Sequence, residues 1–302
     1  MAGEALDAAW RDIHFTSQDG LSLYVRHYRA REGSHARPVL CLPGLTRNGR
    51  DFSRLADHLT TGAGLRRDVY CVDYRGRGQS AYDRNWKNYT PYIEALDVID
   101  FVSIAGLHDA AIVGTSRGGI IAMLMAVMRP SALGAVVLND IGPEVETAGL
   151  ARIVGYVGRT PPAHDWDEAA ELAKGMSGKF FPEIPAGDWP QIARQWFAEK
   201  DGKISPDYDP QLARTMAALD LTRPIPAMWA QFSALGRVPA MAIRGETSDL
   251  LSEETLARMR ASHPSLETLL VEGQGHAPML RDEASLKSIE SFLDRAESTR
   301  IH

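Results

Sequence analysis

A serine placed between two glycines is the feature of this sequence most suited to chemistry. The segment Gly114-Thr115-Ser116-Arg117-Gly118 follows a short apolar run at 110–113 and precedes an apolar run of helical length at 120–127. At a strand-to-helix switch, the G-x-S-x-G pattern is typical of a nucleophile elbow, where glycines let strand and helix approach closely and the serine is strained. The positive end of the helix dipole then faces the hydroxyl and favours a developing oxyanion. The pattern predicts acyl transfer with Ser116 as the nucleophile.

A serine hydroxyl needs a base that removes its proton, and His276 is the best candidate. It lies in the glycine-rich segment 273–278, between the last apolar run and the last helical segment. Loops at such an edge carry function, and glycines allow the imidazole to reach another strand's end. Other histidines occur in less favourable contexts, in strand-like segments, a polar loop or the terminus: His14, His27, His35 and His302.

The histidine in turn needs a carboxylate that fixes its tautomer and stabilises the imidazolium. Asp249 follows the apolar run at 241–243 and precedes His276, which gives the chain order Ser, Asp, His. Glu246 competes from the same segment, and Asp140 competes from the end of the preceding strand. The favoured assignment is Asp249, with the other two carboxylates left open as alternatives.

Two backbone amides are predicted to bind the oxyanion. The amide of Arg117 follows the nucleophile directly, and the amide of Leu45 lies in the loop 42–48, where Gly44 permits an unusual backbone direction. The side chain of Arg117 could bind a substrate carboxylate, although a salt bridge or exposure to solvent is the more common role for an arginine at such a position.

The rest of the chain alternates short apolar runs with segments of helical length. A hairpin is predicted from 13–16 and 21–28, around the turn Gln18-Asp19-Gly20. The later runs are apolar throughout, which is typical of parallel strands buried on both faces. These runs lie at 39–42, 69–72, 110–113, 135–138, 241–243 and 266–271, and a helix is predicted at 283–295. The pattern predicts an α/β fold with a mostly parallel sheet covered by helices on both faces.

One region interrupts this alternation. Between Asn139 and Arg237 the sequence contains helical stretches and prolines but no persuasive strand. An insertion there indicates a helical cap over the strand ends, where open α/β sheets bind ligands. The predicted division is a core of 1–140 and 238–302 with a cap of 141–237. Four tryptophans of the insertion are expected mainly to pack the cap's own small core: Trp166, Trp189, Trp196 and Trp229.

Composition limits the partners and the cellular location. The 302 residues are 44% hydrophobic and carry a net charge of −6, and no basic stripe favours nucleic acid. No stretch approaches the length of a membrane span, and residues 1–10 do not resemble a leader, so a cytoplasmic protein is expected. Cys41 and Cys71 lie in apolar runs and are expected to be reduced core thiols. No metal-ligand cluster is evident. The sequence leaves open whether the protein forms a homo-oligomer.

Taken in order, the motifs resemble the α/β-hydrolase superfamily, specifically its capped members with a serine nucleophile. The segments that carry the resemblance are 42–48, 73–80, 114–119, 245–252 and 275–276. The resemblance implies an eight-stranded, mostly parallel sheet, a cap after the sixth strand, a Ser-Asp-His triad and no cofactor. Two departures are visible. Pro43 stands where many relatives have histidine, and Asp249 lies four residues beyond Gly245 where three is more usual.

The leading hypothesis is a hydrolase of a carboxylic ester, lactone or thioester of a small organic molecule. Ser116 would be acylated, and water activated by His276 would release the acid. Hydrolysis of a carbon–carbon bond in a diketone uses the same triad and is the alternative within this class. A ligand-binding protein with a vestigial triad is an alternative of another class, and the presence of all three residues argues against it. Serine at the elbow disfavours the dehalogenase and epoxide hydrolase chemistries, which need aspartate there.

Overall fold

The protein is built on a single eight-stranded sheet with a smaller hairpin apart from it. The computed structural model describes residues 10–30, 34–223 and 225–298. The strand order is β1-β2-β4-β3-β5-β6-β9-β10, in which β2 pairs antiparallel with both β1 and β4 and every other pair is parallel. The strands are β1 (Arg11–Thr16), β2 (Ser22–Tyr28), β3 (Val39–Leu42), β4 (Val69–Asp73), β5 (Ala110–Thr115), β6 (Leu133–Asn139), β9 (Ala240–Gly245) and β10 (Glu267–Val271).

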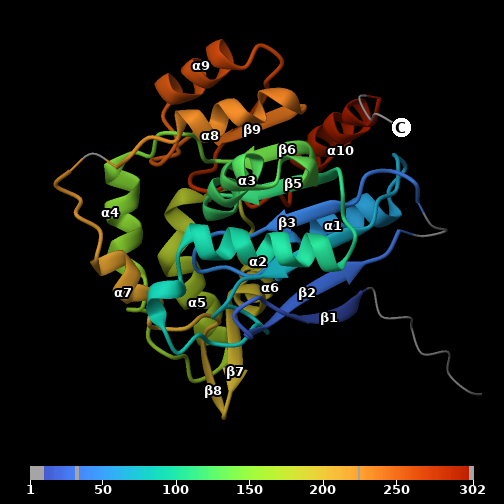
Figure 1. The fold of residues 1–302 in the computed structure, drawn as a ribbon. Coiled ribbons are helices and arrows are strands. Elements are labelled where there is room, and N and C mark those ends of the chain that lie inside the picture. Colours follow the sequence, from blue (N-terminus) through green and yellow to red (C-terminus); the bar gives the residue numbers. More distant parts are fainter. Residues whose placement is uncertain (1–9, 31–33, 224, 299–302) are drawn as a thin grey trace, which may run out of the picture.

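Helices cover both faces of this sheet and create two hydrophobic cores (Figure 1). On one face, α2 (Pro91–Ile104), α3 (Arg117–Met128) and α9 (Glu253–Ser262) bury their apolar side chains. On the other face, α1 (Ser53–Thr61) and α10 (Glu283–Glu297) do so. The central strands β3, β5 and β6 are therefore buried on both sides, as their continuously apolar sequences predict.

The segment between β6 and β9 lies largely outside these layers. It contains α4 (Thr147–Tyr156), α5 (Trp166–Ser177), α6 (Trp189–Trp196), α7 (Leu212–Ala217) and α8 (Trp229–Ala234). In Figure 1, α4, α5 and α7 lie together at the left and lower left, beyond the ends of the sheet strands. Helix α8 differs, because it packs against α3 and its Phe232 belongs to the core of that face.

The expectation that this segment holds no strand is wrong. Strands β7 (Phe197–Lys200) and β8 (Lys203–Pro206) form an antiparallel hairpin. Asp201 and Gly202, both with positive φ of 53° and 72°, make its two-residue turn. Such turns suit the twist of a hairpin. The strands escape notice in the sequence because Glu199, Lys200 and Lys203 leave little apolar alternation.

A small core of its own holds this segment together. Trp189 is buried in it, and its ring meets that of Trp196 edge to face at 6.4 Å. Trp229 instead donates from Nε1 to Glu144, 2.6 Å away. The residues of this core are Ala163, Ala169, Ala170, Ala173, Trp189, Ile192, Ala193, Phe197 and Ile204. The expected packing role thus holds for Trp189, and Trp166 and Trp196 pack against the same core, although Trp196 also lines the cavity described below.

Short 3-10 helices complete the connections. They are η1 (Gly49–Phe52), η2 (Trp86–Asn88), η3 (Pro130–Ala132), η4 (Gly178–Phe180), η5 (Ala186–Asp188) and η6 (Leu235–Arg237).

Cys41 and Cys71 are both buried and free of disulfides, opposite each other in the β3–β4 register. Within the described ranges, no helix has the length and apolarity needed to cross a bilayer. Residues 1–9, nearly all of the segment that the sequence analysis judged unlike a leader, lie outside those ranges, as does His302.

Candidate active site

The predicted elbow is present as a sharp turn between β5 and α3. Ser116 has φ 51° and ψ −111°, a backbone conformation in which an L-residue is strained. Glycine is required on both sides. A Cβ on Gly118 would come within 2.0 Å of the Leu42 carbonyl oxygen, and a Cβ on Gly114 within 2.6 Å of the Gly118 backbone. A hydrogen bond from the Ser116 amide to the Asn139 carbonyl, 2.9 Å, ties the turn to β6.

A chain of hydrogen bonds runs from Ser116 through His276 to Asp140. His276 Nε2 lies 2.9 Å from Ser116 Oγ, and its Nδ1 lies 2.8 Å from Asp140 Oδ2. Because a carboxylate only accepts hydrogen bonds, Nδ1 carries the proton and Nε2 can accept the one on the serine. Asp140 is fully buried, and the imidazole is 7% exposed. This arrangement is that of a nucleophile, a base and an acid that orients the base.

The side-chain carboxylate of Asp140 accepts three hydrogen bonds, and its backbone makes a fourth. The amide of Gly245 donates to Oδ1 at 2.8 Å, while the Ser248 hydroxyl at 2.6 Å and His276 share Oδ2. The backbone N–H of Asp140 donates to the Ile243 carbonyl, 2.8 Å away. The loop after β9 therefore supplies groups that fix the carboxylate, although it does not supply the carboxylate itself.

The expectation that Asp249 pairs with His276 is wrong. Asp249 instead accepts two hydrogen bonds from Arg152 of α4, at 2.6 and 2.7 Å. Burial works to raise the pKa of Asp249, but the hydrogen bonds and charge of Arg152 outweigh it and the pKa is lowered. The other alternative, Glu246, is exposed and accepts from the amide of Gly273 at 2.8 Å. Of the three candidates, only Asp140 contacts the imidazole.

The strand register explains why Asp140 reaches the imidazole. Thr115 of β5 pairs with Asn139 of β6, so Ser116 and Asp140, each one residue further on, lie side by side at the strand ends. Asp249 lies four residues beyond the end of its own strand, where the loop has turned toward α4. One signal in the sequence was available, namely that Asp140, like Ser116, follows its apolar run almost at once.

The two amides predicted to bind an oxyanion are free to do so. In the part of the chain that the structure describes, neither the Leu45 nor the Arg117 backbone N–H has an acceptor. Leu45 lines the cavity next to Ser116, and Arg117 is the first residue of α3.

A buried carboxylate connects the residues that carry these amides. Glu94, fully buried on α2, accepts from Arg117 Nε at 2.5 Å and from Arg77 Nη1 at 2.7 Å. Arg77 Nε donates in turn to the Leu45 carbonyl at 2.9 Å. Burial works to raise the pKa of Glu94, but the two arginines lower it overall. The Arg117 side chain donates to Glu94 and the Tyr89 carbonyl and does not line the cavity at Ser116, so the salt-bridge role holds and the suggestion that it binds a substrate carboxylate is not supported.

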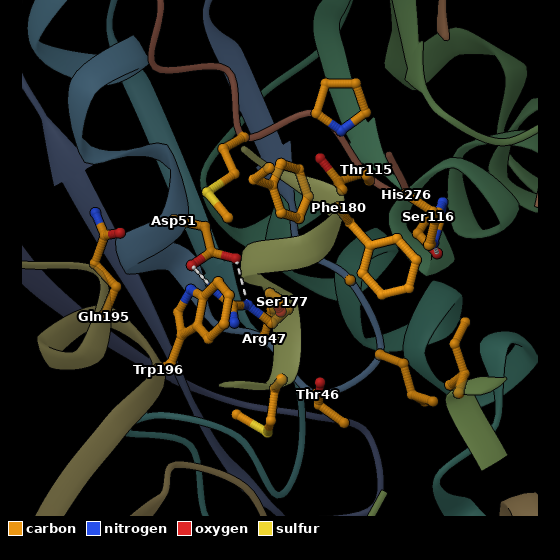
Figure 2. Close-up of a pocket in the computed structure, with 18 of the residues that line it drawn as sticks. Thr46, Arg47, Asp51, Thr115, Ser116, Ser177, Phe180, Gln195, Trp196 and His276 are labelled. Carbon is orange, nitrogen blue, oxygen red and sulfur yellow. Dashed lines mark hydrogen bonds and ion pairs between the residues drawn. The ribbon is translucent and has the colours of Figure 1, made fainter. Parts of the chain in front are cut away.

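A cavity of about 150 Å³ opens at the nucleophile, between the strand ends and the inserted segment. Figure 2 shows Ser116 and His276 at one end and the Arg47–Asp51 pair with Trp196 toward the other, with Phe180 between them. Core loops and inserted helices both contribute to its wall. Within the described residues, no group of three or more His, Cys, Asp or Glu side chains is placed to hold a metal ion.

Comparison with known proteins identifies the family. The sequence model of the alpha/beta hydrolase family matches residues 39–286. The chain belongs to the alpha/beta hydrolase family. This alpha/beta hydrolase is 29% identical over 270 residues to a 3-hydroxybutyrate-oligomer hydrolase of Cupriavidus necator, which covers 87% of this chain and 90% of the relative. It is 27% identical over 269 residues to a 2-(acetamidomethylene)succinate hydrolase of Mesorhizobium japonicum, with the same two coverages.

A solved structure supports the same conclusion. The crystal structure of an alpha/beta hydrolase from Novosphingobium aromaticivorans superposes with a TM-score of 0.85 at 38% identity, covering 95% of this chain and 99% of that one. The predicted fold class and the eight-stranded, mostly parallel sheet are confirmed. The family and the hydrolases among its relatives show that this protein is an enzyme, a hydrolase.

Proposed function

We propose that this alpha/beta hydrolase is a serine hydrolase that cleaves a carboxylic ester, lactone or thioester of a small organic molecule through an acyl-enzyme. The observation that carries the proposal is the Ser116–His276–Asp140 chain, with distances of 2.9 and 2.8 Å. These distances are within the range expected of an activated nucleophile. The role of the acid passes from Asp249, favoured on the sequence, to Asp140.

The proposed reaction has two halves. Ser116 Oγ attacks the substrate carbonyl carbon while His276 Nε2 takes the hydroxyl proton, and the amides of Leu45 and Arg117 stabilise the negative oxygen. The tetrahedral intermediate expels the alcohol or thiol, which receives the proton from His276. Water then loses a proton to His276 and attacks the acyl-enzyme. Collapse of the second intermediate returns the proton to Ser116 and releases the carboxylic acid.

Glu94 is proposed as a positioning residue for this reaction. Its carboxylate fixes Arg117 directly and the Leu45 loop through Arg77. Both loops that carry an oxyanion donor therefore depend on a single buried group. Donors held in place before the reaction contribute more to catalysis than donors that must reorganise.

The named relatives support acyl chemistry on a carboxylated substrate. The Cupriavidus necator relative is named for an oligomer of 3-hydroxybutyrate, whose monomers an ester bond would join. The Mesorhizobium japonicum relative is named for a succinate derivative. Hydrolysis of a carbon–carbon bond in a diketone is compatible with the same triad and is included in the test below.

We also propose a division of the chain into a core and a cap. The core comprises 1–140 and 229–302, and residues 141–228 form the cap that covers Ser116. Packing of α8 on α3 supports placing the end of the cap before Trp229 and not at residue 237.

Active-site labelling and a substrate panel test the proposed function. A fluorophosphonate should label the protein once, at Ser116, and Ser116→Ala should abolish labelling and lower turnover by about three to six orders of magnitude. Ser177→Ala is the matched control, because Ser177 is the other serine that lines the cavity, and it should still be labelled. The panel comprises 4-nitrophenyl esters, a lactone, a thioester and a diketone. Turnover of the diketone alone, or labelling that survives Ser116→Ala, would contradict the ester hydrolase.

A further inference from the structure

Three arginines line the cavity at Ser116: Arg47, Arg152 and Arg281. Each is paired with a carboxylate, respectively Asp51, Asp249 and Asp188. These ion pairs balance the charges of the arginines, so any further role in binding depends on guanidinium donors that the carboxylates do not use.

Arg47 lines this cavity and keeps one guanidinium donor unused among the described residues. Its Nε and Nη2 donate to Asp51 at 2.8 and 2.7 Å, and its guanidinium stacks on the Trp196 ring at 3.6 Å. Among the described residues, Nη1 has no acceptor. Burial lowers the pKa of Arg47 despite the partner carboxylate.

Arg152, on α4, has the same arrangement of a carboxylate partner and an aromatic ring. Its Nε and Nη2 are used by Asp249, its guanidinium lies 4.4 Å from the Phe180 ring centre, and its Nη1 has no acceptor within the described ranges. Tyr156 lies one turn further along α4 and also lines the cavity. Burial raises the pKa of the Tyr156 hydroxyl, while the charges of both arginines and a hydrogen bond with the Thr46 side chain act to lower it.

Arg47 lies apart from the reacting serine. In Figure 2, Arg47 stands toward one end of the cavity and Ser116 with His276 at the other, and the Phe180 ring lies between. A molecule that places its acyl carbon at Ser116 would therefore reach Arg47 with a different part of its structure.

We infer that the substrate carries a carboxylate separate from the bond that is cleaved, and that Arg47 and Arg152 bind it through their free Nη1 groups with the Tyr156 hydroxyl. This inference rests on the proposed function, because it places the acyl group at Ser116. The ligand class is an anionic ester, such as an ester of a dicarboxylic acid or of a hydroxy acid with a free carboxyl terminus. Arginine suits this task because its planar donors match a carboxylate.

A simpler interpretation assigns both arginines to structure alone. Asp51 and Asp249 use one edge of each guanidinium and join loops of the core to inserted helices. That role accounts for the paired edges, but it leaves Nη1 of each arginine without an acceptor among the described residues, in side chains that line the cavity. A purely structural role also predicts no preference for charged substrates, which makes the two interpretations separable.

A pair of matched esters distinguishes the carboxylate subsite from a purely structural role of the arginines. The pair is 4-nitrophenyl glutarate, with a free carboxylate, and 4-nitrophenyl methyl glutarate, in which a methyl ester removes the charge. We expect kcat/KM to favour the anionic ester by about tenfold or more at low salt, and the preference to shrink as ionic strength rises. Arg47→Gln with Asp51→Asn, and Arg152→Gln with Asp249→Asn, remove each ion pair whole and should bring the ratio near one, mainly through KM. Arg258→Gln is the control, because Arg258 pairs with Glu144 outside the cavity.

Binding to an inactive protein keeps this test independent of turnover. Ser116→Ala protein should bind monomethyl glutarate at least about tenfold more tightly than dimethyl glutarate in calorimetry, and both double variants should lose that difference while melting as cooperatively as the parent. Equal binding of the two, or a preference that survives both double variants, overturns the carboxylate subsite even if esters are hydrolysed. Selective binding without hydrolysis of any ester overturns the proposed function and leaves the subsite standing.

Discussion

Two carboxylates at the ends of neighbouring strands have separate partners in this molecule. Asp140 follows β6, is fully buried, and contacts His276. Asp249 follows β9, has a side chain that is 29% exposed, and contacts Arg152 of the inserted segment. The first carboxylate orients the base. The second joins a loop of the core to α4. The two elements are in close contact, because a Cβ added to Gly149 of α4 would lie 2.4 Å from the Asp249 carbonyl oxygen.

The comparison shows that position after a strand does not decide a carboxylate's role. Both strand ends are needed for the site, because Gly245 at the end of β9 and Ser248 in the loop after it donate to Asp140. What differs is the number of residues between the strand end and the carboxylate. One residue keeps Asp140 at the sheet edge beside Ser116, whereas the longer path carries Asp249 to the inserted helix.

The largest expected effect that sharpens this comparison comes from Asp140→Asn. Loss of the carboxylate removes the group that keeps the proton on His276 Nδ1, so we expect kcat to fall by about 10⁴ with little change in KM. Steady-state kinetics on a 4-nitrophenyl ester would measure it, with Asp249→Asn assayed in parallel. A larger loss in Asp249→Asn than in Asp140→Asn would reverse the assignment.

A smaller effect is expected at Glu94, a third carboxylate, which is buried on α2 between two arginines. Glu94→Gln leaves Arg77 and Arg117 without their shared buried charge, and we expect kcat to fall by about 10²-fold through misplacement of the oxyanion donors, with KM nearly unchanged. Removing a buried ionic partner also destabilises the fold by about 3 to 5 kcal/mol, so thermal melting must accompany the kinetics.

Glu94→Asp provides the control for that variant. It retains the charge with a shorter side chain and should recover part of kcat. Equal loss of stability in the two variants with no difference in kcat would argue that Glu94 supports only the fold.

The smallest expected effect is that of Asp249→Asn. Because Asp249 does not contact His276, kcat should change by less than about tenfold, compared with the loss of about 10⁴ expected for a triad acid. The free energy of unfolding at pH 7 should fall by about 1 kcal/mol, as for a partly exposed ion pair.

The pH dependence of that stability difference follows from the direction of the shift. Arg152 lowers the pKa of Asp249 below its ordinary value of 3.8 in the folded protein, after burial has been overcome. The pair therefore stabilises the native state at pH values above that value, and its contribution is lost as the pH falls through the folded pKa. Urea unfolding of the parent and Asp249→Asn should differ at pH 7 and converge in acid. A difference that grows in acid would contradict the assigned ion pair.

Much of the fold is determined by local sequence. Continuously apolar runs such as Val39–Leu42 predict strands buried on both faces, and the structure places β3 in that environment. Glycines at Gly114 and Gly118 permit the turn at Ser116, because any side chain would collide with neighbouring backbone. These features can be read from the sequence because the physical cause lies within a few residues. The hairpin β7–β8 could not, because its strands are too polar to show a period.

The partner of His276 was decided only by the tertiary structure. Asp140, Glu246 and Asp249 each stand near a strand end in the sequence, and the choice among them depends on the β5–β6 register and on where the inserted α4 lies. The same holds for Arg117, whose partner Glu94 lies 23 residues away on another helix. Side-chain pairs of this kind form between elements that are distant along the chain, and packing alone brings them together. Sequence therefore determined which chemical groups were available, and the register of the sheet determined which of them meet.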